Sequence, residues 1–192
     1  MKTIDIIHNE HRALAAVLQA LRYVVNEIRE ARSEADFRLL SAMIDYITQV
    51  PEKVHHPKED RCLFARLRDR SARAGTLIDE LERQHHQGYK LTVSLQQALI
   101  HYQSMGSRGF PAFDAVLQEY LDFNWDHLNL EETELLPLAR ESLTESDWEE
   151  IDAEFAANFD PCSGIEGEFD ELFKRIVNLT PAPYGLGSSG SS

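Results

Sequence analysis

Two histidine–glutamate pairs with identical spacing stand far apart in the sequence, and their residue types suit metal chemistry. In each pair, His55 with Glu59 and His127 with Glu131, the carboxylate follows the imidazole by four positions. Residues four apart lie on the same face of an α-helix, one turn from each other. Each pair can therefore present an imidazole nitrogen and a carboxylate oxygen in one direction.

Two further histidines, His11 and His85, occur in other helical stretches of the chain. Burying imidazole or carboxylate in a bundle core costs several kcal/mol unless the group is paired, and a metal satisfies several such groups at once. Inward-facing Glu and His side chains on several helices build di-iron and di-manganese centres. A set without thiolate favours iron or manganese, and it exceeds what one tetrahedral zinc uses. We predict two metal ions with the ligands His11, His55, Glu59, His85, His127 and Glu131.

Adjacent histidines leave alternatives to this ligand set. His56 follows His55 and His86 follows His85, each rotated by about 100° on an ideal helix. We expect His56 and His86 to support the site or to be exposed. The sequence leaves open whether either one replaces its neighbour as a ligand. His8, one turn before His11, is expected to line the site or to pack against it.

Helical periodicity runs through nearly the whole chain, and it predicts the elements that must position these residues. Prolines at Pro51 and Pro57 predict a kink or restart near His55, and Pro137 predicts a bend after Glu131. The apolar pattern predicts four long helices at about 3–30, 34–70, 72–104 and 110–142, and two short ones at about 144–158 and 165–179.

The predicted fold class is all-α, an up-down-up-down four-helix bundle with two additional short C-terminal helices, because four long helices with short connections pack that way by default. Residues 1–142 form the bundle and residues 143–180 a helical extension of the same domain. Residues 181–192 are rich in Gly, Pro and Ser and have too little apolar content to fold alone, so we expect a flexible tail.

Composition narrows the functional classes. The 192 residues carry 33 Asp and Glu against 19 Lys and Arg, a net charge of −14 that argues against nucleic acid and anionic membrane as partners. No apolar stretch reaches the roughly 18 to 20 residues of a membrane span, and the N-terminus lacks a signal-peptide pattern. Cys62 and Cys162 form no disulfide framework, and we expect Cys62 to be a small buried hydrophobic residue. These observations predict a cytoplasmic protein.

Four motifs stand in order along the chain: Glu10-His11-Arg12, His55-His56-Pro57-Lys58-Glu59-Asp60 with Leu63-Phe64, Gln84-His85-His86-Gln87-Gly88, and His127-x-x-x-Glu131-Glu132 with Leu135-Leu136-Pro137. Their order and spacing resemble the hemerythrin-like (HHE cation-binding) family over about residues 3–142. The resemblance implies a four-helix bundle with two iron ions, bridged by Glu59 and Glu131 and completed by the predicted histidines; manganese or zinc are the alternatives.

The sequence departs from the oxygen-carrying members of that family at two points. Where they have a fifth histidine, four residues after His85, this chain has Tyr89; Glu131 follows His127 by four positions where they place Asp five after. Tyr89 is a candidate to ligate a ferric ion, to hydrogen-bond to a bound oxygen species, or simply to pack. Fewer imidazoles leave an open metal position, which favours reactivity or sensing over oxygen carriage.

Three functions fit this pattern. The first is a di-iron protein that binds or reacts with oxygen, nitric oxide or peroxide for sensing, storage or detoxification. The second is iron handling or iron–sulfur repair, and the third is an interaction module that metal merely stabilises. An apolar face left uncovered on the C-terminal helices would also favour a homodimer.

Overall fold

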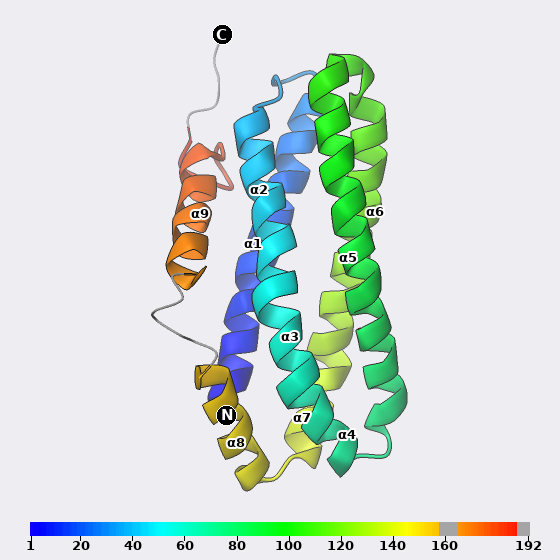
Figure 1. Ribbon diagram of the computed structural model, residues 1–192. Coiled ribbons are helices and arrows are strands. Elements are labelled where there is room, and N and C mark those ends of the chain that lie inside the picture. The colour runs from blue at the N-terminus through cyan, green and yellow to red at the C-terminus, as the bar shows by residue number, and fades with distance from the viewer. Residues whose placement is uncertain (158–164, 188–192) are drawn as a thin grey trace.

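Within residues 1–157 and 165–187, which the computed structural model describes, the regular structure is helical and contains no β-strand. Four long helical segments stand side by side and alternate in direction, so the predicted up-down-up-down bundle is confirmed (Figure 1). Residues 158–164, which lie between the two predicted short helices and include Cys162, and the last five residues of the predicted tail lie outside the described ranges.

Two of the long segments are single helices and two are composite. The first and third are α1 (Lys2–Arg29) and α5 (Ala74–Met105). The second runs through α2 (Phe37–Val50), η1 (Pro51–His55), α3 (His56–Lys58), η2 (Glu59–Phe64) and α4 (Ala65–Arg70). A 3-10 turn, η3 (Gly106–Arg108), leads to the fourth, which comprises α6 (Phe110–Leu130), η4 (Glu131–Leu135) and α7 (Leu136–Ser142). The segments η1, η2 and η4 are π-helical turns.

Local sequence explains where several helices begin. The Asp36 side chain accepts hydrogen bonds from the backbone N–H groups of Arg38 and Leu39 at the start of α2. At the start of α8 (Glu145–Ala157), Thr144 and Asp147 form a capping box: the Thr144 backbone N–H donates to Asp147 over 2.9 Å, and the Asp147 N–H donates to Thr144 Oγ1 over 3.3 Å. Side-chain acceptors at these positions satisfy N–H groups that the helix itself cannot.

The helical extension packs on the bundle at two places. The helix α8 lies against the N-terminal end of α1, where Asp152 accepts hydrogen bonds from the backbone N–H groups of Lys2 (3.0 Å) and Thr3 (2.8 Å) (Figure 1). The helix α9 (Ile165–Leu179) lies beside α2, and Ile176 is buried there. Residues 181–187 fold back in turns, with the Leu186 N–H donating to the Val177 carbonyl over 2.8 Å.

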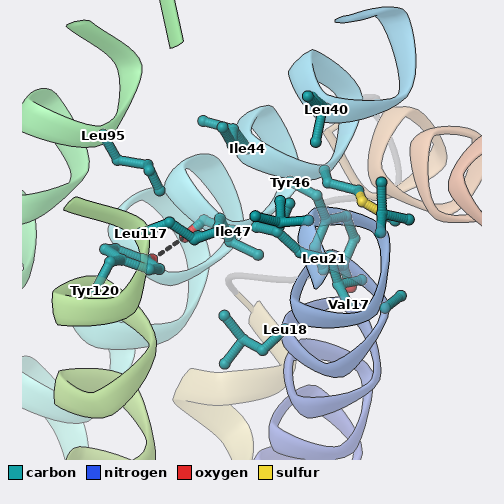
Figure 2. Close-up of a cluster of buried hydrophobic side chains, with 14 of the residues drawn as sticks. Val17, Leu18, Leu21, Leu40, Ile44, Tyr46, Ile47, Leu95, Leu117 and Tyr120 are labelled. Carbon is teal, nitrogen blue, oxygen red and sulfur yellow. Dashed lines mark hydrogen bonds between the residues drawn. The ribbon is translucent and has the colours of Figure 1, made fainter. Parts of the chain in front are cut away.

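The bundle core consists of two separate apolar clusters. The upper apolar cluster lies around Leu21, Ile47, Leu95 and Leu117, and it is closed by a hydrogen bond of 3.0 Å from the Tyr120 hydroxyl to the Ile47 carbonyl (Figure 2). The lower apolar cluster is centred on Ile7, Leu63, Phe64, Leu81, Leu135 and Phe155, the last from α8. Full burial of each such side chain stabilises the fold by about 1.5–3 kcal/mol. The residues between the clusters are polar.

Candidate metal centre

A buried polar layer crosses the bundle between the two apolar clusters. Along α1, His11 lies between Ile7 of the lower cluster and Leu14 of the upper one. The other three long segments interrupt their apolar stripes at the same level. The layer contains all six side chains that the sequence predicted as ligands, with exposed fractions of 0–7%: His11, His55, Glu59, His85, His127 and Glu131.

The helices are locally widened where they enter this layer. The π-helical turn η2 begins at Glu59, and η4 begins at Glu131. Proline has no N–H, so Pro57 and Pro137 leave the carbonyls four residues earlier, within η1 and η4, without their α-helical donors. The interruption that the prolines predicted therefore takes the form of π-helical turns, a distortion frequent at functional sites.

Glu131 faces three histidines from three different helical segments. Its Oε2 lies 3.1 Å from His11 Nε2, while its Oε1 lies 3.4 Å from His127 Nε2 and 3.8 Å from His85 Nε2. The carboxylate therefore points one oxygen toward α1 and the other toward α5 and α6. A carboxylate directed at several helices in this way could contact a cation bound among them.

Glu59 occupies the matching position on the second segment. Its Oε2 lies 3.5 Å from His55 Nε2 and 3.7 Å from His85 Nε2. His55 Nε2 is in turn 2.9 Å from His11 Nε2. The imidazole nitrogens and both carboxylates thus converge on one small volume.

Most donor atoms of this volume have no hydrogen bond. Among the described residues, both carboxylate oxygens of Glu59 and of Glu131 and the Nε2 atoms of His85 and His127 are buried without a hydrogen-bond partner. A buried polar atom left without a partner costs about 1–3 kcal/mol. Six such atoms facing one another fit a bound cation, which would satisfy them together.

The outward-facing nitrogen of each histidine is held by an acceptor. Carboxylate and amide oxygens only accept hydrogen bonds, so each Nδ1 carries the proton and each Nε2 is left facing inward. Such outer contacts orient metal-binding histidines and raise their basicity. The four bonds join His11 to Glu132 (2.7 Å), His55 to Glu10 (2.8 Å), His85 to Asp60 (2.8 Å) and His127 to Gln84 (2.9 Å).

Two of these acceptors are themselves held by neighbours. The Gln84 Nε2 donates to Glu80 over 2.8 Å, which turns the amide oxygen of Gln84 toward His127. The ammonium group of Lys58, only 3% exposed, lies 3.4 Å from Glu10 and 5.8 Å from the ring centre of Phe155 in α8. The helical extension therefore reaches the layer around the metal centre through Lys58.

The carboxylates make two of the histidines strongly basic. Burial acts to lower the pKa of His11, but its contacts with Glu131 and Glu132 outweigh burial and raise the pKa to about 10. The same balance, with Asp60 and Glu131 outweighing burial, raises the pKa of His85 to about 10. Without metal, both imidazoles are therefore in the doubly protonated, positively charged form at neutral pH.

The pKa values of the other buried groups shift in different directions. Burial lowers the pKa of His127 to about 4, and its Nδ1 faces a neutral amide rather than a carboxylate. Burial and the nearby Glu131 raise the pKa of Glu59 well above its usual range, whereas Glu131 is held well below it because His127, His11 and His85 outweigh its burial. Two facing carboxylates do not both ionise readily without a cation, and a metal ion would allow it.

Tyr89 does not lie in the buried layer. Its side chain is 58% exposed, and this exposure argues against the ligand and oxygen-binding roles considered from the sequence. The buried stripe of α5 passes through His85, Gly88 and Thr92, so position 89 falls beside the stripe. His86 is exposed as well.

Two other histidines lie nearer to the centre. His8 is half-buried, and its Nε2 lies 3.2 Å from Glu132 Oε2, so it supports the acceptor of His11. His56 is half-buried, with its ring 3.9 Å from that of His85. Cys62 is buried in the lower apolar cluster, as predicted, and burial followed by contact with Glu154 raises its thiol pKa to about 12.

The fold and this layer together define a helical bundle with a cation-binding centre, and the family comparison agrees. The model of the hemerythrin HHE cation binding domain matches residues 2–139, most of the chain. The chain belongs to this family. No curated protein sequence matches the chain closely enough to add a named relative. In the part of the chain that is described, no helix has the length and hydrophobicity that a membrane crossing requires.

Proposed function

We propose that this chain is a di-iron protein that binds or reacts with a small molecule such as oxygen, nitric oxide or peroxide. The observation that carries the proposal is the set of six buried donor atoms without hydrogen bonds, on two carboxylates and two imidazoles that face one another. Iron would supply redox chemistry and an open coordination position; the protein supplies binding, orientation and electrostatics.

Charge balance supports two divalent ions rather than one. The carboxylates in and directly around the layer outnumber the single ammonium by four when all are ionised. Two divalent cations would neutralise that excess. The groups are Glu10, Glu59, Asp60, Glu131 and Glu132, with Lys58 as the ammonium.

The donor chemistry favours iron or manganese over a structural zinc. Imidazole with carboxylate suits iron and manganese, and the groups of candidate ligands contain no thiolate. A structural zinc site uses four ligands in a tetrahedron, fewer than this layer offers. Zinc and manganese remain the competitors that metal analysis must separate from iron.

The protein surroundings suit a small ligand. Glu59 and Glu131 are 0% exposed, and the apolar clusters cover the layer above and below. Hydrogen bonds hold the imidazole rings in place, and their acceptors are Glu10, Asp60, Glu132 and Gln84. The fixed rings would therefore determine which coordination position is open to a small ligand. Such complete burial favours a molecule of a few atoms over a larger substrate.

The test is the response of the iron-loaded protein to each candidate ligand. Reduced protein exposed separately to oxygen, nitric oxide and peroxide should develop visible absorption bands with at least one of them. An iron-loaded protein whose spectrum is unchanged by all three would contradict the reactive function and favour metal as a structural element. Loading with zinc is the matched control, because zinc has no redox chemistry.

A further inference from the structure

The metal centre contains a second group of converging donors. One ring nitrogen from each of His56, His85 and His127 lies within 4.8 Å of the others. This group is distinct from the first, in which His11, His55, Glu59 and Glu131 each offer one donor atom within the same limit. The two groups share no residue.

The ring of His56 lies among the histidines of the second group. It stacks on His85 with ring centres 3.9 Å apart and planes 14° apart, and it meets His127 edge-on with centres 5.4 Å apart and planes 85° apart. His55, the neighbouring residue, has its ring centre 5.6 Å away and belongs to the first group. Consecutive histidines thus serve two different groups.

The backbone explains how both side chains reach the core. On an ideal α-helix they would be rotated by about 100° from each other. Here His55 ends the π-helical turn η1, and its ψ of −70° departs from the α-helical value of about −42°. The wider π-turn reduces the rotation between successive residues, so His56 turns inward as well.

We propose that His56 is a third imidazole ligand, on the metal ion held by His85 and His127. Without it, that ion would have two imidazoles and the shared carboxylates. The first group already has two imidazoles for its ion. The inference rests on the proposed two-ion centre and makes its two ions inequivalent. On α6, the position that corresponds to His56 is Leu128, so the fourth helical segment offers no corresponding additional donor.

The test compares His56→Leu with His86→Leu, which alters the exposed second histidine of the other adjacent pair. Each protein is loaded with cobalt(II) without oxygen, and the solvent-exchangeable N–H protons of coordinated imidazoles are counted by paramagnetically shifted NMR. We expect five in the unaltered protein and in His86→Leu, and four in His56→Leu. A supporting role would leave the count unchanged in His56→Leu, and that result would overturn the proposal.

Metal titration provides the second readout. His56→Leu should weaken one of the two cobalt-binding steps by at least about tenfold and leave the other unchanged. In His56→Gly, added imidazole should restore the weakened step, which keeps the test decisive if the leucine variant folds poorly. Unaltered binding in both variants would contradict the ligand role. An unaltered protein that binds fewer than two ions would instead contradict the proposed function on which the inference rests.

Discussion

The metal centre has two similar halves, and their comparison shows what each residue contributes. One half contains His55 with Glu59 and the other His127 with Glu131, each glutamate opening a π-helical turn. The residue after each glutamate holds a histidine of another helix: Asp60 holds His85, and Glu132 holds His11. The repeated frame places one carboxylate on each side of the centre.

The halves differ in charge and in the number of histidines. His55 Nδ1 is held by the carboxylate of Glu10, whereas His127 Nδ1 is held by the neutral amide of Gln84. The helical segment of the first half also carries Lys58 and His56, where that of the second has leucine, and the ring of His56 lies against His85 and His127. The repeated arrangement supports the proposal of two ions, and the differences predict that two such ions would bind unequally.

Removal of either shared carboxylate should have the largest effect. Glu59→Ala and Glu131→Ala should each lose most of the bound metal at both positions, because each carboxylate faces histidines of more than one helical segment. Elemental analysis of iron-loaded, desalted protein measures this. Glu134→Ala, at an exposed glutamate of η4, is the control and should keep its metal. Full metal retention in either core variant would show that the halves do not share their carboxylates.

Metal affinity should rise steeply with pH. His11 and His85, one in contact with each half, have a pKa of about 10 without metal, and both must lose a proton to bind it. Between about pH 7 and 9 the apparent affinity should increase by about 100-fold per pH unit, with at least two protons released per chain, because any proton that Glu59 holds without metal is released as well. Calorimetry in buffers of different ionisation enthalpy measures the release. A metal affinity that does not change with pH would show that His11 and His85 are not protonated in the metal-free protein.

The same pKa values set the stability of the metal-free fold. A histidine pKa raised on folding stabilises the fold fully below the unfolded value of about 6.5, and this stabilisation is lost as pH rises through about 10. Metal-free protein should therefore lose stability from about pH 7 to 10. Metal-loaded protein should lose less, because its imidazoles are already neutral. Denaturant unfolding at each pH compares the two forms.

Bound metal should stabilise the fold beyond what the two apolar clusters provide on their own. Free metal at 100 times Kd adds about 2.7 kcal/mol per site, which raises Tm by roughly 5–10 °C for a chain of this size. Thermal unfolding with and without a chelator measures the shift. Leu117→Ala in the upper cluster should lower Tm in both forms and leave the metal-dependent shift intact. A Tm that the chelator does not change would argue against a centre that supports the fold.

The smallest expected effect comes from making the halves alike. Glu10→Gln gives His55 the neutral partner that His127 already has, and it should lower metal affinity by about tenfold. Gln84→Glu should act in the opposite direction by adding a negative charge beside His127. Glu30→Gln, at an exposed position beyond α1, is the control. Equal affinities in all three variants would show that the outer charges do not tune the ions.

The sequence predicted the long helices and the six inward residues because both follow from helical periodicity. It could not identify Glu10 and Gln84 as hydrogen-bond acceptors, since that depends on the register between neighbouring helices. The expectation that His56 supports the site or is exposed assumed α-helical rotation after His55. A π-helical turn precedes His56 instead, and the ring lies against that of His85. The fifth-ligand argument at Tyr89 relied on spacing alone, although the buried stripe of α5 runs beside that position.

The most direct test of the two-ion centre is the metal content of the protein purified without added metal. Elemental analysis combined with quantitative amino-acid analysis gives metal ions per chain and their identity. We predict about two ions per chain, predominantly iron. A content well under one iron or manganese per chain, which does not increase on anaerobic loading with iron(II), would contradict the account.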